Sequence, residues 1–496
     1  MKGVLLFNPI NVVHDRQIDL FMRYLTGWEI RCIYNPALPW FSAKPRHEGR
    51  EVVWFRNRRP PASVFDGVRG IVMFTGQPRV EPCGLIEKAM LRSIPVMIIE
   101  EVHQMALEQG DVNNYVLPVD RLFAASEYER GEFVKAGVPE CVVEATGCPL
   151  GFRYGRRSSP EDKRMLKARL GLSENKRTAL LSLRYITPNG ETAEIRDATI
   201  GVVSRSLPEG YELLVKPHPG EQDREIAKKV RLVSKAAVVT DPRIPIDELL
   251  DVSDVLFDRG NSQAVFDALW KGLPVIVVPM GKRTIFHGIA DDIIAENEYG
   301  ISRAFDAIKK NGMDIYRQVF ERYLNISPED ALKRTMSRID EAARRNELYD
   351  RDEKILLIAL FWAWMGYDIQ GRRVMRSLDR RRPKIDRIAD SIESLVSMSA
   401  TQDDLNILRQ WTGDGFGQWL LASMWIKESF FSGRGIRKDD EEWLEDFPPK
   451  MNNSHFANYN RMLGAMRGDS APWRVKLDLG VKTAAKSLAW EFSRFS

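Results

Sequence analysis

The sequence has little of what marks secreted, metal-binding or nucleic-acid-binding proteins. Its 496 residues include only four cysteines, and none of them lies in a Cys-x-x-Cys spacing. This scatter argues against a disulfide framework and a zinc site, and it indicates a reducing compartment. The formal net charge of +4 is small for this length. We therefore expect no nucleic-acid partner, because such proteins usually carry a large basic excess.

Long apolar runs are missing as well. The longest run, 355–367, is far short of the roughly 20 residues that a membrane span needs. The first nine residues combine one charge with an apolar run that is too short for a signal peptide, and they indicate a first strand. We expect a soluble, cytoplasmic protein whose only membrane contact would be peripheral, at the inner face of the cell membrane.

Two stretches of the chain alternate short apolar runs with helical patterns. The first predicts strands at 3–7, 30–34, 52–55, 71–74, 96–99, 122–125 and 142–145. The second, from about 178 to 310, predicts strands at 213–215, 236–240, 254–258 and 274–279. Such alternation predicts parallel sheets with crossover helices. Beyond about 330, helical patterns dominate.

The chain is too long for one ordinary domain. A polar stretch at 155–159 reads as a linker. We predict an α/β domain at 1–155, a second α/β domain at 156–325 and a helical extension at 326–496. Two successive α/β domains form a cleft between them, which is the usual place for a small-molecule site.

In the second domain, Lys216-Pro217-His218-Pro219 follows a predicted strand. The two prolines stiffen the backbone around His218. Lysine offers a point charge to an anion, and histidine can donate to a phosphate oxygen or a leaving group. A rigid surface turn with a solvated lysine is the alternative.

A second polar segment, 258–262, follows the next strand along. Gly260 allows close approach of the backbone to a ligand, and Asn261 or Ser262 would cap the following helix. Arg259 could add a bidentate grip on phosphate. Asp267, on the otherwise apolar helix, could accept from ribose hydroxyls. The alternatives are an ordinary strand-to-helix turn and a solvent-facing aspartate.

In the first domain, the polar cluster is Glu100-Glu101-Val102-His103, directly after a predicted strand. Carboxylates and a histidine at a strand end are plausible general bases; a charged loop is the alternative. Two other histidines are weaker candidates. His14 could face the cleft, and His287 could serve the last ligand loop of the second domain, but surface positions are the simpler reading of both.

The order of motifs resembles the GT-B transferases, and in particular the CDP-glycerol glycerophosphotransferases and the bacterial sialyl- and Kdo-transferases of surface polysaccharide synthesis. The pieces that carry the resemblance are 216–219, Thr240-Asp241, 253–256, Asn261-Ser262 with Phe266-Asp267, and 272–275. Segments 119–126 and 146–149 are similar to the closing part of the acceptor domain. The resemblance covers roughly 70–300.

The resemblance implies two Rossmann-like domains facing a cleft, with a nucleotide-activated donor substrate in the second. Lys216 and His218 would contact the donor phosphates or assist the leaving group. Asn261 and Ser262 would hold phosphate. The segment 241–246, which begins with Asp241, would lie near the nucleobase of the donor. Glu100, Glu101 or His103 would stand where related enzymes place the catalytic base. No metal ion or other cofactor is implied, because this fold type stabilises the leaving phosphate with protein groups.

The helical extension carries a strongly apolar, aromatic stretch at 352–367, predicted as a buried core helix. After it, residues 372–387 hold eight basic and two acidic side chains. Such a stretch can hold a protein on anionic lipid, which would suit a lipid-linked acceptor. A solvated face of a helical bundle is the alternative.

The sequence thus favours a nucleotide-sugar-dependent glycosyltransferase that acts on a glycan or lipid-linked acceptor. Two other functions stay open at this point. A nucleotide-sugar epimerase of the same fold would consume its substrate without an acceptor. A non-catalytic nucleotide-sugar-binding subunit would bind and not turn over.

Overall fold

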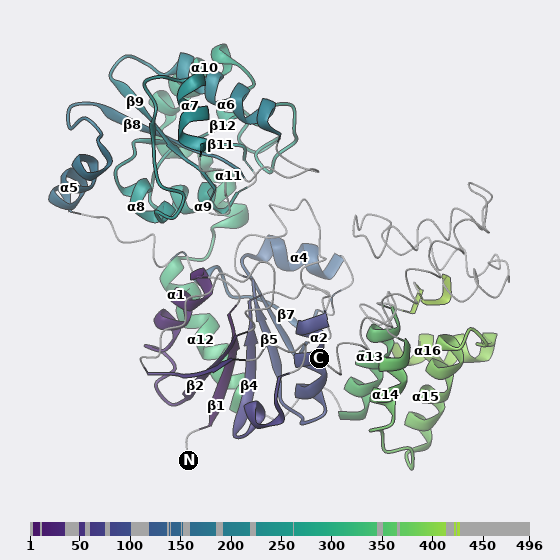
Figure 1. Cartoon of the computed structure of the whole chain (residues 1–496). Helices are drawn as coiled ribbons and strands as arrows, with labels where there is room; N and C mark the ends of the chain where they lie inside the picture. The colour runs from purple at the N-terminus through teal and green to yellow at the C-terminus, as the bar shows by residue number, and fades with distance from the viewer. Residues whose placement is uncertain are drawn as a thin grey trace.

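The computed structural model contains two parallel sheets, followed by a helical region (Figure 1). The fold class expected from the sequence, two Rossmann-like α/β domains and a helical extension, is confirmed. The structure describes residues 3–9, 12–34, 49–54, 60–74, 80–100, 119–135, 138, 140–149, 151, 159–184, 192–218, 225–260, 262–344, 351–364, 368–412, 421–422 and 424–426.

The first sheet has seven strands in the order β3-β2-β1-β4-β5-β6-β7, with parallel neighbours throughout. Buried parallel strands read as continuous apolar runs, which is why the sequence reveals them. The strands are β1 (Val4–Asn8), β2 (Glu29–Tyr34), β3 (Glu51–Trp54), β4 (Val68–Met73), β5 (Val96–Ile99), β6 (Arg121–Ala124) and β7 (Val143–Ala145). The helical segments between them are α1 (Val12–Phe21), η1 (Ala62–Phe65), α2 (Val80–Met90) and α4 (Glu127–Lys135).

The second sheet has five parallel strands in the order β10-β9-β8-β11-β12. Its strands are β8 (Arg177–Ser182), β9 (Tyr211–Lys216), β10 (Val238–Val239), β11 (Val255–Asp258) and β12 (Val275–Val277). Its helical segments are α5 (Pro160–Leu170), α6 (Ala193–Ser206), α7 (Ile226–Val233), α8 (Ile246–Asp251), α9 (Gln263–Trp270), η4 (Asp291–Ile293), α10 (Glu298–Asn311), η5 (Gly312–Tyr316) and α11 (Arg317–Tyr323). The predicted strands agree with the observed ones within a few residues at each end, but β8 is not among the predicted strands.

After the second sheet, the chain returns to the first domain through α12 (Pro328–Arg344), which lies beside the first sheet in Figure 1. One face of this helix, with Leu332, Met336 and Ile339, is buried in the same cluster as β1, β2 and α1. The Thr335 hydroxyl also donates to Thr146 at 2.9 Å, in the interior. Helix α12 is therefore part of the packing of the first domain.

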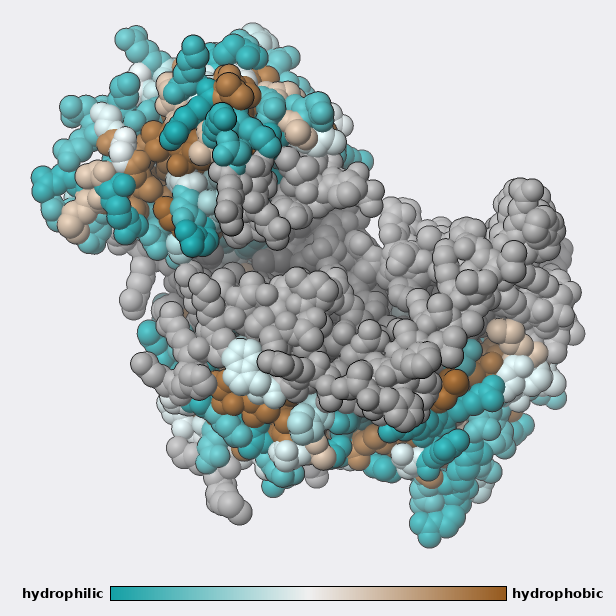
Figure 2. All heavy atoms as spheres, viewed as in Figure 1, coloured by the Kyte–Doolittle hydropathy of each residue, from teal (hydrophilic) through white to brown (hydrophobic). Residues whose placement is uncertain are grey.

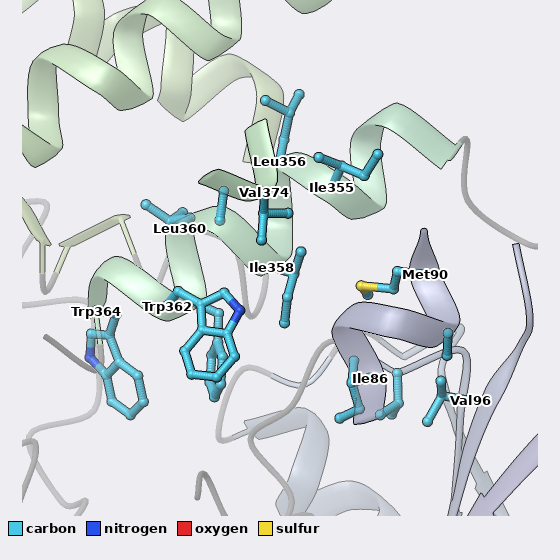
Figure 3. Packing of buried hydrophobic residues seen from close by; sticks show 14 of the residues in the cluster. Ile86, Met90, Val96, Ile355, Leu356, Ile358, Leu360, Trp362, Trp364 and Val374 are labelled. Atoms are coloured by element: carbon cyan, nitrogen blue, oxygen red, sulfur yellow. The ribbon is translucent and has the colours of Figure 1, made fainter. Parts of the chain in front are cut away.

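The helical region shares its core with the first domain. It contains α13 (Arg351–Trp364), α14 (Asp368–Met375), α15 (Pro383–Val396) and α16 (Gln402–Thr412). Helix α13 is buried nearly all round, as predicted for this apolar stretch. Figure 3 shows Ile355, Ile358 and Trp362 of α13 in the same packed layer as Ile86 and Met90 of α2. One apolar cluster thus joins the two parts.

Buried polar contacts fix the same junction. The Lys354 ammonium lies 2.8 Å from Asp120 Oδ1, with both side chains almost wholly buried. Asp120 also accepts from the Val96 N–H at 2.8 Å. Glu87 of α2 accepts from the Trp362 indole at 3.0 Å and from the Gln370 amide at 2.6 Å. These directional contacts specify one docking position for the helices.

Much of the basic stretch at 372–387 is paired with acidic side chains. Arg380 contacts Asp386, Asp390 and Glu393. Arg381 pairs with Asp379, and Arg382 pairs with the buried Asp352. Figure 2 shows a hydrophilic surface over the outer end of these helices. Within the described residues, no helix is both long and apolar enough to cross a membrane.

The two sheets' domains also touch through aromatic side chains. Tyr128 of α4 meets Tyr323 of α11 edge to face, with ring centroids 5.3 Å apart, and the Arg322 guanidinium lies over the Tyr128 ring. Trp270, at the end of α9, packs against the buried Cys148. Such contacts hold the two domains together close to the point where the chain returns from the second domain to the first.

We predict that Lys354→Met lowers the free energy of unfolding by about 3–5 kcal/mol, because the Asp120 carboxylate stays buried without its cation. Urea denaturation measures this change. Lys384→Met is the matched control, because Lys384 is an exposed lysine 3.9 Å from Glu353, and its effect should stay within about 0.5 kcal/mol. Equal losses in the two variants would contradict the role of the buried pair.

Candidate functional site

Most of the polar residues singled out in the second domain follow strands of one parallel sheet, at its carboxyl edge. Lys216 ends β9, Asp258 ends β11, and Asp241 follows β10. The strand order reverses between β8 and β11. In open α/β sheets, ligands bind outside the carboxyl ends of the strands at such a reversal. The candidate site is therefore the edge where the loops after β8, β9 and β11 meet.

Asp258 organises the loop after β11. Its side chain is fully buried and accepts from the Gly260 N–H at 2.8 Å and from the Ser262 hydroxyl at 2.7 Å. Burial raises the pKa of this carboxyl group, while the charge of Arg184 and these two hydrogen bonds oppose the rise. The carboxylate thus fixes the path of the chain from β11 into α9.

Ser262 is the N-cap residue of α9, but its side chain does not cap the helix. The sequence predicted a cap at Asn261 or Ser262; Asn261 lies outside the described residues, and the Ser262 hydroxyl donates to Asp258 instead. The first N–H groups of α9 consequently lack the Ser262 side chain as an acceptor. A helix N-terminus of this kind suits an anion.

Gly260 has a structural reason to be glycine. Its φ is +82°, in the left-handed region. A Cβ atom there would lie 2.5 Å from Val277 Cγ1 and 2.8 Å from Thr284 Cγ2. The sequence assigned this glycine to close approach by a ligand, but the space a side chain would need is occupied by two side chains of the protein.

Arg259 is buried and donates from Nη2 to the Pro279 carbonyl at 2.8 Å. It therefore ties the loop after β11 to the loop after β12. A bidentate grip on phosphate, expected from the sequence, would compete with this contact.

Lys216 is also buried, and its Nζ donates to the Pro242 carbonyl at 2.9 Å and to the Pro217 carbonyl at 3.2 Å. Burial lowers its pKa from 10.5 to about 8, although the charge of Asp241 acts in the other direction. The lysine thus joins the loops after β9 and β10. His218, two residues on, is exposed at the same edge.

Two predicted donor-substrate contacts, Asp241 and Asp267, are already engaged. Asp241 binds Arg243 at 2.6 Å, and hydrogen bonds from Arg243 lower its pKa to about 2. Asp267 is 2% exposed and accepts from the Gln263 amide at 3.2 Å. Neither reading of Asp267 from sequence, a ribose contact or a solvent-facing residue, included its burial against its own helix.

Arg184 is the residue of this edge that the sequence reasoning missed. It lies two residues after β8, beside the reversal of the strand order, and it is half-buried. Its charge acts on Asp258. The signal was available, because a basic residue follows within three positions of the apolar run 179–181.

In the first domain, Glu101 and His103 lie outside the described residues. Glu100 is described and is fully buried, and its Oε2 accepts from the Ala125 N–H at 2.6 Å. This carboxylate joins the ends of β5 and β6. His14 is also fully buried and stacks on Phe74, with centroids 4.5 Å apart, so it is not a surface histidine.

We predict that Gly260→Ala destabilises the second domain, by about 1–2 kcal/mol for the left-handed backbone and a further 1–3 kcal/mol or so for overpacking. Thermal or urea unfolding measures the loss. Gly210→Ala is the control, because Gly210 has a φ of +86° and no atom within 4 Å of the added Cβ. It isolates the backbone contribution, and the prediction is wrong if the two variants lose the same stability.

We predict that wild type gains stability relative to Lys216→Met as the pH rises from about 8 to about 10.5. The native lysine loses its proton near pH 8, whereas the unfolded lysine holds it to about 10.5. The unfolded state therefore binds more protons in this window, and the free energy of unfolding rises with pH. Urea denaturation at several pH values checks this; parallel curves for the two proteins would refute it.

Comparisons with known proteins give likenesses of fold. No family model matches the chain, and no curated protein matches its sequence. Similar solved structures include the wall teichoic acid polymerase TagF, at 13% identity and a TM-score of 0.49 over 69% of this chain and 89% of that one. The UDP-GlcNAc 2-epimerase of Neisseria meningitidis (14%, 0.46) and a glycosyltransferase of Rickettsia africae (11%, 0.46) each align over 69% of this chain and 99% of theirs.

Proposed function

We propose that the protein is a GT-B type glycosyltransferase. It would move a sugar or polyol phosphate from a nucleotide-activated donor substrate to a glycan or lipid-linked acceptor, in the assembly of cell-surface polysaccharide. The observation that carries the proposal is the carboxyl edge of the second sheet. There the N-terminus of α9, which Ser262 does not cap, lies beside the charge of Arg184 at the reversal of the strand order.

Phosphate binding at this edge follows from the hydrogen-bond donors. The first N–H groups of α9 and the Arg184 guanidinium suit phosphate oxygens. His218, exposed after β9, would donate to the leaving phosphate. Preorganised donors stabilise the charge that develops on a leaving phosphate at little reorganisation cost.

Nucleobase binding is assigned to the loop after β10. Lys216 holds the Pro242 carbonyl from inside the domain, and the Asp241–Arg243 pair braces the start of the loop. In this proposal, Lys216 acts on the donor substrate through the loop it positions. In this proposal, Asn261 would contact the donor phosphates, and Arg259 would contribute its charge nearby while it binds the Pro279 carbonyl.

The acceptor would bind on the first domain, with Glu101 or His103 as the base that deprotonates its hydroxyl. Glu100 is unsuited to this role, because it is buried and bonded to the Ala125 N–H. A peripheral contact with anionic lipid would rest on Arg373, Arg376 and Arg387 of the basic stretch. These three side chains form no ion pair with the described residues.

A thermal-shift screen of the full chain against CMP, CDP, UDP, GDP and ADP tests the proposal. We expect one nucleotide to raise the Tm by mass action, with the shift lost in His218→Ala. Arg231→Ala, an exposed change in the last turn of α7, should keep the shift.

Three experimental outcomes, one from the thermal-shift screen and two from activity assays, would change the proposal. Absence of a shift with every nucleotide would favour a protein without this activity. Full activity of His218→Ala would remove His218 from the mechanism. Consumption of a nucleotide sugar without an acceptor would identify an epimerase.

A further inference from the structure

The loop after β12 is a built structure at the carboxyl edge of the second sheet. It leaves the sheet after Val277 and returns at Ile294, which forms a parallel bridge with Val277. Two of its glycines, Gly281 and Gly288, have φ near +80°. The Gly281 N–H donates to Glu296 at 2.9 Å, and the Gly288 N–H donates to Asp291 at 2.9 Å.

The same loop is pinned against the start of α9. Arg259 binds the Pro279 carbonyl, and the Thr284 side chain occupies the space beside Gly260. Phe286 is fully buried in the core of the second domain. The segment 284–287 therefore has a fixed position next to the turn that precedes the N-terminus of α9.

His287 ends this segment, and its ring is oriented by the backbone. Nδ1 lies 3.0 Å from the Thr284 nitrogen, 3.1 Å from the Thr284 hydroxyl and 3.3 Å from the Thr284 carbonyl oxygen. The shortest of these contacts is a hydrogen bond from the backbone N–H, which can only donate, so Nδ1 is its acceptor. A neutral imidazole whose Nδ1 accepts carries its proton on Nε2. The ring is half-buried, and Nε2 makes no hydrogen bond with the described residues. It is an oriented hydrogen-bond donor with no partner inside the described chain.

We propose that His287 Nε2–H donates to a phosphate oxygen of the nucleotide-activated donor substrate. The inference rests on the proposed function and adds a contact from a fourth loop, beside those after β8, β9 and β11. Three features support it: the fixed tautomer, the uncommitted Nε2, and the packing of Thr284 on the Gly260 turn. An N–H donor in this place lies near the N-terminus of α9, which the Ser262 side chain does not cap.

Two substitutions separate this role from a purely structural one. His287→Asn keeps a side-chain acceptor at the position of Nδ1 and removes Nε2. His287→Gln reaches toward the position of Nε2 with an N–H donor and gives up the short acceptor. If His287 only secures the turn, His287→Asn should be tolerated and His287→Gln should lower stability. If His287 binds phosphate, His287→Asn should weaken phosphate binding more than His287→Gln does.

The experiment measures, by calorimetry on the full chain, the Kd of the nucleoside diphosphate that shifts wild type most and of its parent nucleoside. We expect His287→Asn to weaken the diphosphate about tenfold or more, since it removes a hydrogen bond to a charged group. Its Kd for the nucleoside and its Tm without ligand should match wild type. Unchanged diphosphate affinity in the folded Asn variant would overturn the inference.

A second pair covers the case in which His287→Asn does not fold. His287→Gln and His287→Met have similar length and both lack the Nδ1 acceptor, so they carry the same structural defect. Only Gln has the distal N–H, and we expect it to bind the diphosphate several-fold more tightly than Met does; equal affinities would refute the contact. If wild type binds none of the nucleotides, the proposed function fails and this inference fails with it. If wild type binds and the variants bind equally, the inference alone is wrong.

Discussion

The second domain depends on one buried carboxylate, that of Asp258. It accepts from the backbone of Gly260 and from the hydroxyl of Ser262, and so it decides two things at once. The turn after β11 takes a shape that only glycine fits, and Ser262 is drawn away from the helix that it would otherwise cap. A buried carboxylate is tolerated only with such partners. One of these partners, Ser262, is therefore an N-cap residue whose side chain does not cap α9.

The first domain depends on a different constraint: the two faces of its sheet are buried by helices that come much later in the chain. The apolar cluster that covers one face of the first sheet continues into α13 to α16, and α12 covers part of the other face. The helices after 350 cannot leave without exposing that sheet and the Lys354–Asp120 pair. They are thus a structural part of the domain to which we assign the acceptor. If these helices take part in acceptor selection, they would do so as a rigid surface of the first domain.

Sequence patterns predicted the fold well, because buried parallel strands are continuous apolar runs. They also placed Lys216, Asp258 and Ser262 at one edge, since parallel strands share their carboxyl ends. They could not predict where a side chain points. Arg259 turns inward to Pro279, Asp267 pairs with Gln263 on its own helix, and Lys216 faces two carbonyls. Each outcome depends on a neighbour that is distant in sequence or on packing that no local pattern encodes.

These orientations change which groups would contact phosphate under the proposed function. Lys216 and Arg259, the cations most evident in the sequence, use hydrogen bonds to carbonyls, and burial brings the lysine pKa to about 8. The two side chains remain near the carboxyl edge of the second sheet, but their N–H groups are used to position loops. Under the proposed function, direct contacts with the donor phosphates would come from the α9 backbone, His218, His287 and Arg184. Oriented dipoles discriminate by geometry more than charges do, because they reward an oxygen only at the right place. A site built this way would bind a phosphate that the rest of the donor substrate holds in one position more tightly than it would bind free phosphate.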